Sequence, residues 1–240
     1  MIRIILIISL LILSSCSSKK EEIKTAANSY IKAMELLDDK DFSQAAEKFE
    51  AIYDDYPLSK WSIKAGTVAV YAYYKEKRYE DVVRVSETFI SLSPASEYIP
   101  YFQYMKAISY FNMIPNVDRG QNFTKDASYA FRELLARFPY SDYLEDSKKK
   151  ILIIDEQLAA AKMTIARYQM ARENYIGAIM YLNDVVYRYA KTNHSSEAYA
   201  RLFEVYYKLG MTEKAQRVKN EMLQNHTEGY WVDYLNKISS

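Results

Sequence analysis

Apolar side chains recur at intervals of three and four residues along most of the chain, and no run alternates between apolar and polar positions. The first spacing places apolar groups on one face of an α-helix, whereas a half-buried strand needs strict alternation. Only five glycines interrupt the pattern. We therefore expect an all-α fold.

Three turns share one pattern, namely proline, any residue, serine, any residue and an aromatic residue. They lie at 57–61, 94–98 and 139–143. Proline disfavours helix in the residue before it, so each motif is expected to end a helix. The serine can cap the next helix by accepting a hydrogen bond from a free backbone N–H. The aromatic residue then begins the next buried face.

A second recurring element is a tight turn followed by a small or apolar residue, where two helices would cross closely. It occurs at 40–45, 77–82, 173–178 and, more weakly, 210–215. Ala45 and Val82 are 37 residues apart, as are Pro57 and Pro94. This spacing is close to the tetratricopeptide period of roughly 34 residues.

These features resemble the tetratricopeptide family and predict an α-solenoid of about five degenerate helix-turn-helix repeats. The matching positions are Ala45, Phe49 and Pro57 in the first unit, Ala127, Phe131 and Pro139 in the third, and Ala178 and Leu182 in the fourth, where Ala190 replaces proline. The fifth unit, around Ala215, is the most degenerate. An ordinary helical bundle is the alternative, but the pair of recurring turn motifs would then have to arise three times by chance.

Two departures from regular spacing divide the chain. Pro94 and Pro139 are 45 residues apart, so the third unit carries an insertion, which we place at 112–122. The pattern from Ser141 to about Arg172 lacks glycine and proline and predicts one extended helix, or two with a subtle break. We expect repeats 1–3 in residues 23–140. The long linking helix and repeats 4–5 would then occupy residues 141–240.

The N-terminus has the pattern of a secretory signal peptide in residues 1–15. Arg3 precedes an apolar run from Ile4 to Leu13, which is too short to span a bilayer as a helix. The sequence Leu-Ser-Ser-Cys that ends at Cys16 resembles a bacterial lipobox. That resemblance implies N-acyl and S-diacylglycerol groups on Cys16, with 16–22 as lipidated cysteine and tether. The alternative is an ordinary signal peptide in which Cys16 is incidental.

Cys16 is the only cysteine of the chain. Acylation would consume its thiol, leaving no disulfide, no thiolate nucleophile and no cysteine metal ligand. Ser17 is not the aspartate that marks inner-membrane retention in the best-known lipoproteins, so the resemblance implies an outer-membrane anchor that faces the periplasm. Several acyl chains are needed, because one alone binds a membrane only marginally.

Charge and residue types favour a binding protein over an enzyme. The 32 basic and 31 acidic residues balance, which gives no electrostatic signature for nucleic acid. Five scattered glycines cannot build a phosphate-binding loop. His194 and His226 lie in different expected turns, so we interpret both histidines as surface residues. We predict no catalytic residue, no metal site and no cofactor beyond the lipid.

Tyrosine is abundant, with 24 residues against nine phenylalanines and two tryptophans. Tyrosine suits surfaces that are apolar on one side and wet on the other, and stacked helix pairs form a concave binding surface. Aligning the first helix of each unit with the family predicts a peptide-binding groove across repeats 1–3. The residues assigned to it are Tyr30, Lys64, Tyr71, Tyr74, Tyr101, Tyr104 and Phe111, with Met34 and Ile108 beside them. We expect about half of these tyrosines to fill core instead.

The lipobox and the repeats together resemble the BamD family, lipoproteins of the outer-membrane β-barrel assembly (BAM) machinery. The likeness covers essentially the whole mature chain, and its order and spacing are more specific than any single motif. The stretches that carry it are 56–58 (YPL), 71–75 (YAYYK), 104–107 (YMKA), 117–119 (VDR) and 138–143 (FPYSDY).

This resemblance implies a non-enzymatic scaffold that promotes the folding and insertion of outer-membrane proteins. Family members bind the barrel subunit BamA, through its POTRA domains, with their C-terminal repeats, and they associate with other subunits of the complex. Their N-terminal repeats are thought to engage the C-terminal strand of unfolded barrel substrates. The fourth unit here departs from the family in its proline, so we assign BamA binding to a segment, 151–229.

Two other classes of function remain open. A tetratricopeptide lipoprotein that scaffolds peptidoglycan or cell-division enzymes would have the same fold and anchor. An enzyme with a site assembled across the groove would need a pair of carboxylates brought together by folding.

Overall fold

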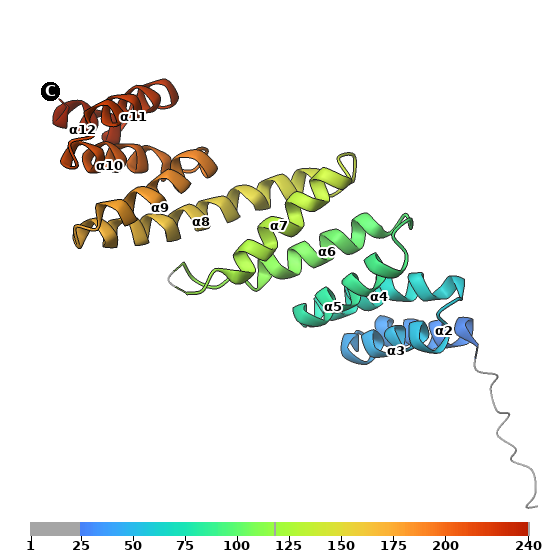
Figure 1. Ribbon diagram of the computed structural model, residues 1–240. Helices are drawn as coiled ribbons and strands as arrows, with labels where there is room; N and C mark the ends of the chain where they lie inside the picture. Colours follow the sequence, from blue (N-terminus) through green and yellow to red (C-terminus); the bar gives the residue numbers. More distant parts are fainter. Residues whose placement is uncertain (1–24, 118, 240) are drawn as a thin grey trace, which may run out of the picture.

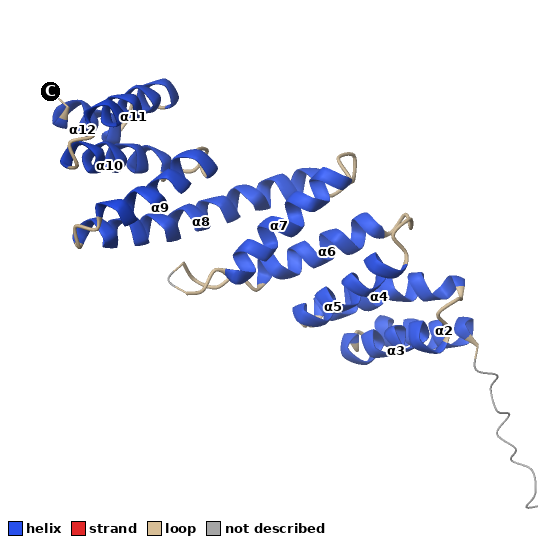
Figure 2. Cartoon of the chain, viewed as in Figure 1, coloured by secondary structure: helices blue, strands red, loops and turns tan. Residues whose placement is uncertain are grey.

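The computed structural model describes residues 25–117 and 119–239, and these hold only helices and loops (Figures 1 and 2). The predicted all-α fold is confirmed. The predicted signal peptide, the lipidated Cys16 and the tether to residue 22 lie outside the described residues, as does Asp118.

The helices pair into antiparallel hairpins that stack into an elongated array, with α2 and α12 at opposite ends (Figure 1). Their bounds are α2 (Ala26–Asp38), α3 (Phe42–Asp55), α4 (Lys60–Lys75), α5 (Tyr79–Leu92), α6 (Ile99–Asn112), α7 (Asn122–Arg137), α8 (Leu144–Ala171), α9 (Tyr175–Arg188), α10 (Ser195–Lys208), α11 (Thr212–Asn225) and α12 (Tyr230–Ile238). Five hairpins, α2–α3 through α10–α11, form the tetratricopeptide-like solenoid. The first helices α2, α4, α6, α8 and α10 also contact one another in succession, so they share one side of the array.

Four of the five hairpins turn in the same way. The second residue after the first helix adopts a left-handed conformation, with φ of 62° at Lys40, 59° at Lys77, 60° at Glu173 and 69° at Gly210. The next residue donates its N–H to a carbonyl five residues back, for example Asp41 to Leu36 at 2.9 Å. This is the Schellman arrangement, which satisfies carbonyls that the helix end leaves free. The recurring tight turns in the sequence are therefore helix caps.

Small side chains allow the paired helices to approach. Ala45, Val82, Ala127, Ala178 and Ala215 are all buried, as the repeat pattern predicts. The closest approach is at Gly66 on α4. A Cβ added there would lie 2.2 Å from the ring of Phe89 on α5, so the packing of these helices requires glycine.

In two of the three proline turns, the serine hydroxyl accepts a hydrogen bond from a backbone N–H. Ser59 is the N-cap of α4 and accepts a hydrogen bond from the N–H of Trp61 at 3.2 Å. Ser96 accepts from Tyr98 at 3.2 Å, one turn ahead of the helix proper. The expected cap at Ser141 is wrong, because its hydroxyl has no hydrogen-bond partner among the described residues and α8 begins after Tyr143.

The third hairpin has a longer loop where the others have a tight turn, at the insertion expected in 112–122, and its residues other than Asp118 are described. Gln121 donates its side-chain N–H to the carbonyls of Asn116, Val117 and Arg119 at 2.9 to 3.3 Å. Gln157 of α8 donates to the carbonyl of Pro115 at 2.6 Å. Amide side chains thus replace the backbone bonds of a regular turn and tie the loop to α8.

The uninterrupted pattern after residue 141 forms one 28-residue helix, α8. It is also the first helix of the fourth hairpin, pairing with α9. Its N-terminal part, with Ile151, Ile154 and Leu158, belongs to the core of repeats 2 and 3, while Ala159, Met163 and Ala166 belong to the C-terminal core. The two halves of the solenoid therefore meet along α8.

The sequence pattern did not reveal α12, the helix that ends the array. Gly229, with φ of 117°, begins it, and Val232 and Leu235 pack into the core formed by α8–α11. Arg201 of α10 lies over the ring of Trp231, with its guanidinium carbon 5.0 Å from the ring centre. Among the helices that the structure describes, none is both long and apolar enough to cross a membrane.

Candidate functional site

A groove of about 520 Å³ lies on the side of the solenoid formed by the first helices. Helices α2, α4 and α6 form its walls, together with the turns that precede α6 and α8. Its lining is almost wholly apolar or aromatic, and consists of Tyr30, Met34, Leu37, Thr67, Val68, Tyr71, Tyr98, Tyr101 and Tyr143.

Three of the seven predicted groove residues line this groove directly, namely Tyr30, Tyr71 and Tyr101. Tyr30 packs between Phe49 and Trp61, with ring centres 5.2 and 4.9 Å away. Tyr101 is fixed by donating its hydroxyl hydrogen to the carbonyl of Thr67 at 3.1 Å. Tyr71 has 43% of its surface exposed. The groove thus has two fixed aromatic walls and one accessible ring.

Tyr104 lies beside the groove and supports its wall. Its ring stacks on that of Tyr143, with centres 4.4 Å apart and planes 16° apart. Its hydroxyl donates to Asp146 of α8 at 2.9 Å. Tyr104 therefore positions Tyr143, which is the residue that faces the groove.

The other predicted residues lie on the same helices but outside the groove. Lys64 is exposed, with its Nζ 5.8 Å from the centre of the Trp61 ring. The Tyr74 hydroxyl accepts from Asn112 at 3.0 Å. Phe111 packs beneath Lys150, whose Nζ is 5.0 Å from its ring centre. Ile108 is buried in the core of repeats 2 and 3, so its assignment to the concave face was wrong.

Sequence reasoning missed Tyr98 and Tyr143, although the proline motif contains both. Each is the aromatic residue of a Pro-x-Ser-x-aromatic turn, and Trp61 occupies the same place before α4 and packs on Tyr30. We interpreted these residues as the start of a buried face. The structure shows instead that the aromatic residues of the second and third motifs, Tyr98 and Tyr143, line the groove, while Trp61 packs against the core of the first repeat.

Among the described residues, no acidic or basic side chain lines the groove. Burial raises the pKa of the Tyr101 phenol, and burial together with the hydrogen bond to Asp146 raises that of Tyr104. Burial likewise raises the pKa values of Tyr30 and Tyr143. All four phenols keep their protons, and Tyr101 and Tyr104 already donate theirs to Thr67 and Asp146. Such a surface suits an extended peptide with aromatic or aliphatic side chains.

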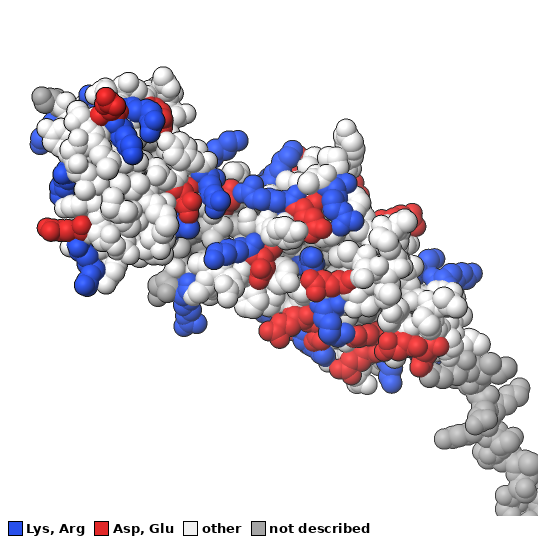
Figure 3. Space-filling model, in the orientation of Figure 1, with Lys and Arg blue, Asp and Glu red and all other residues white. Residues whose placement is uncertain are grey.

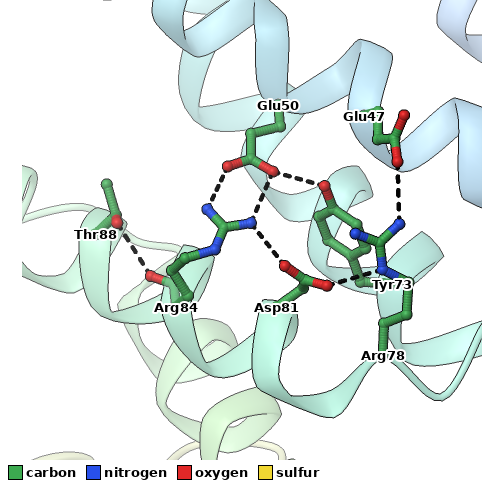
Figure 4. Close-up of polar contacts among 7 residues, drawn as sticks. All are labelled: Glu47, Glu50, Tyr73, Arg78, Asp81, Arg84 and Thr88. Atoms are coloured by element: carbon green, nitrogen blue, oxygen red, sulfur yellow. Dashed lines mark hydrogen bonds and ion pairs between the residues drawn. The ribbon is translucent and has the colours of Figure 1, made fainter.

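Behind the groove, a network of charges joins the second helices of repeats 1 and 2 (Figure 4). Arg84 of α5 bonds both Glu50 of α3 and, at 2.9 Å, Asp81. Tyr73 donates its hydroxyl to Glu50 at 2.6 Å, and Arg78 reaches Asp81 at 2.8 Å. The network fixes the relative position of two hairpins that contribute groove walls.

These carboxylates are not arranged for acid–base chemistry. Burial alone would raise the pKa of the Glu50 carboxyl, but hydrogen bonds from Arg84 and Tyr73 outweigh it and lower the pKa. The same balance, with bonds from Arg84 and Arg78, lowers the pKa of Asp81. Both groups are held as anions paired with arginine, whereas a general acid needs a raised pKa.

His226 is the only histidine in contact with a hydroxyl among the described residues. Its Nε2 lies 3.2 Å from the Oγ of Ser195, and its ring packs on Tyr199. It is half-buried at the end of α11, unlike the surface residue that we expected. No carboxylate partner orients its other ring nitrogen among the described contacts, so it forms no catalytic triad. Nor do the described residues gather three metal-ligating side chains.

Charge is unevenly distributed over the surface (Figure 3). On the face shown, acidic side chains gather over α3 and α5, whereas Lys and Arg side chains form a row over α8 and the end of α7. On this face, acidic and basic side chains thus gather over different repeats, although the charges of the whole chain nearly balance.

Among characterised proteins, the chain is similar to outer membrane protein assembly factors named BamD. It is 32% identical to the protein of Rickettsia prowazekii, over 93% of this chain and 90% of that protein. Identity is also 32% with the protein of Caulobacter vibrioides, over 78% and 62% of the two chains, and 28% with that of Vibrio cholerae, over 91% and 96%.

Two solved structures of tetratricopeptide proteins are distant matches. The tandem tetratricopeptide domain of yeast Sti1, in complex with an Hsp90 peptide, has a TM-score of 0.42 and 12% identity over 84% of this chain and 78% of its own. A tetratricopeptide repeat protein from Parabacteroides merdae has a TM-score of 0.40 and 12% identity, over 83% and 79%. Similarity at this level carries no information about partners.

A protein-family model also matches the chain. Residues 22–222 match the family described as outer membrane lipoprotein (YfiO), a range that runs from before α2 into α11 and includes every residue of the groove. The chain therefore belongs to the YfiO family of outer membrane lipoproteins.

Proposed function

We propose that this protein is an outer-membrane protein assembly factor that holds an unfolded β-barrel substrate in its N-terminal groove and the assembly machinery on its C-terminal repeats. The observation that carries the proposal is the uncharged, tyrosine-lined groove of repeats 1–3 in a chain whose relatives are named as assembly factors. It would act as a scaffold rather than as an enzyme, because the buried Glu197 and the partly buried Glu50 and Asp81 are paired with arginine.

The groove fits an extended chain in both size and chemistry. A terminal barrel strand is rich in aromatic side chains, which can pack on Tyr71 and between the fixed rings of Tyr30 and Tyr101. The rings of Tyr30, Tyr101 and Tyr143 already make their internal contacts before a ligand binds. Binding would then require little ordering of the protein, which preserves affinity.

The groove is tested with a fluorescent peptide of the last strand of an outer-membrane β-barrel protein. Tyr71→Ala removes an accessible ring that no described residue hydrogen-bonds, and we expect about tenfold weaker binding by anisotropy. Tyr71→Phe keeps the ring and should retain most of the affinity. Tyr129→Ala, an exposed tyrosine on α7 outside the groove, is the matched control. Equal affinity for Tyr71→Ala and the control would refute a client groove at this place.

The C-terminal repeats have a surface suited to a second protein. Ile176 and Met180 are 66% and 57% exposed on α9, and Tyr187 lies on the same helical face. Exposed apolar stripes of this kind mark protein contacts more often than free surface. We assign the contact with BamA to this half of the chain, within the segment 151–229.

A pull-down from membranes with the lipid anchor retained tests that assignment. We expect BamA to be recovered, and to be lost when Ile176 and Met180 are both replaced by lysine, while Tyr129→Lys has no effect. Recovery of murein hydrolases or synthases without BamA would favour the alternative, a scaffold for peptidoglycan or cell-division enzymes. The two proposed functions predict the same fold and differ only in the partner that the pull-down captures.

Attachment to the outer membrane at its periplasmic face would rest on acylation of Cys16. The family description as outer membrane lipoprotein and the single cysteine of the chain support this proposal. Metabolic labelling with palmitate should mark the wild type and not Cys16→Ser. The Cys16→Ser protein should also fail to sediment with outer membranes.

A further inference from the structure

A second hollow, of about 840 Å³, lies on α8 where the two halves of the solenoid meet. Arg132 and Leu135 of α7 form one side, and residues 187–193, from the end of α9 and the following turn, form the other. Residues 151–156 of α8 make its floor. We call it the seam cavity. It does not share any residue with the tyrosine groove.

Apolar side chains in the seam cavity are unusually exposed. Leu152 and Ile153 of α8 are 56% and 53% exposed, and Tyr187 of α9 is 60% exposed. The buried Ile151 and the half-buried Leu135 and Tyr189 extend this surface inward. Several large apolar groups exposed together, rather than singly, indicate a contact surface.

Charges at the rim are mostly basic and only partly paired. Asp155 is already taken by Arg132, at 2.7 and 2.8 Å, and Glu156 accepts the backbone N–H of Asn193 at 2.9 Å. Lys191 is exposed and forms no ion pair with any described residue. Arg188 has only a contact of 3.9 Å with Asp184, and it is 73% exposed. Two cations therefore face solvent beside the apolar floor without a close anionic partner.

We propose that the seam cavity docks a segment of a partner protein that carries a large apolar side chain next to a carboxylate. The apolar side chain would lie on Leu152 and Tyr187, and the carboxylate would meet Arg188 and Lys191. The complementarity is one of charge as well as polarity, because the acidic groups of the cavity are already satisfied. A cavity of this size, open and rimmed by charge, accommodates a few residues of peptide.

The position of the cavity gives the docked segment a structural effect. Helices α7 and α9 both pack on α8, and the cavity lies where they leave its exposed residues uncovered. A segment seated there would touch elements of both halves at once. It would thereby restrain the angle between the groove-bearing repeats and the C-terminal repeats.

The test uses a displayed library of random twelve-residue peptides, selected on the purified mature protein. We expect one class of enriched peptides to combine Leu, Phe or Trp with Asp or Glu. This class should bind about tenfold more weakly to Arg188→Glu/Lys191→Glu, because two favourable charge contacts become repulsive. The changed residues are solvent-exposed, so the fold should persist, as a circular dichroism melt would verify.

Three further variants separate the possible outcomes. Leu152→Glu should abolish binding of the same peptides, and Arg188→Lys/Lys191→Arg, which keeps both charges, should retain it. Tyr71→Ala should leave it unchanged, which distinguishes this site from the tyrosine groove. The proposal is overturned if no acidic and apolar class is enriched, or if the enriched peptides bind equally to Arg188→Glu/Lys191→Glu.

Discussion

Tyr71 and Tyr101 in the first half of the solenoid line a groove, whereas Tyr199 and Tyr206 on α10 in the second half are buried. Tyr71 is 43% exposed, against 4% for Tyr199 and 7% for Tyr206. All four lie on the first helix of a repeat. Both halves thus carry tyrosines on the first helices of their repeats, but these rings line a groove in the first half and are buried in the second.

The difference lies in what each ring packs against. The ring of Tyr199 packs on His226 at the end of α11, and Lys214 of α11 lies over the ring of Tyr206, so both rings face the second helix of their own hairpin. Tyr71 and Tyr101 line the groove between first helices, which no described helix covers. A tyrosine-rich repeat therefore becomes a binding surface or a core according to its neighbours. The comparison yields four predictions.

The largest loss of stability is expected from shortening a side chain of α12 that packs in the C-terminal core. Leu235→Ala removes a fully buried side chain and should lower the free energy of unfolding by about 2–4 kcal/mol. Urea unfolding followed by circular dichroism measures it, and Lys237→Ala, on the exposed face of α12, is the control. Peptide binding in the N-terminal groove should not change. A loss no larger than that of the control would mean that α12 is not part of the C-terminal core.

The next effect concerns the packing of α4 on α5, which supports the groove. Gly66→Ala places a Cβ 2.2 Å from Phe89, whose ring is stacked on Phe102 with centres 5.0 Å apart. Alanine has the better helix propensity, but overpacking should dominate and destabilise the protein by about 1–2 kcal/mol.

Gly120→Ala is the matched control, because nothing lies within 4 Å of a Cβ at that position. It should be neutral or slightly stabilising in the same thermal denaturation assay. A neutral Gly66→Ala would show that the Phe89 ring can move away, and that the contact between these helices is looser than the structure indicates.

A smaller effect is expected from the charge network of the first half. Arg84→Ala should cost about 0.5–1 kcal/mol at neutral pH, since the network is partly exposed. Glu50 and Asp81 have pKa values lowered below 4.5 and 3.8 in the folded protein. Their stabilising contribution is therefore complete above those values and is lost as pH falls through the folded pKa values. The difference between wild type and Arg84→Ala should shrink in acid; a constant difference would contradict the pairing.

The smallest expected effect is a loss of stability at mildly acidic pH that is confined to the C-terminal half. Burial lowers the pKa of His226 below 6.5, so the unfolded chain binds that proton more readily than the folded one. Its contribution to stability is complete above 6.5 and is lost as pH falls through the folded value. We expect the C-terminal half to lose hydrogen-exchange protection at mildly acidic pH, where the carboxylates of the first half are still charged. His226→Gln should remove this loss, and an unchanged profile would exclude His226 as its cause.

Much of the solenoid could be read from local sequence. The turns at Lys40, Lys77, Glu173 and Gly210 and the buried small residues Ala45 and Ala178 follow from contacts within one hairpin. Helix caps and helix crossings are short-range, so the residues that make them recur at a fixed spacing. The same reasoning located three of the groove residues, because the family alignment identifies the inward face of each first helix.

Contacts between hairpins could not be predicted from local sequence. The stacking of Tyr104 on Tyr143, the cover that α12 gives to α10 and the seam cavity on α8 all join residues that no local pattern pairs. Sequence by itself determined the all-α repeat and the abundance of tyrosine. Only the tertiary structure decided which tyrosines stay accessible, because exposure depends on what packs against each ring, and the groove is formed by stacked hairpins that are distant in the chain.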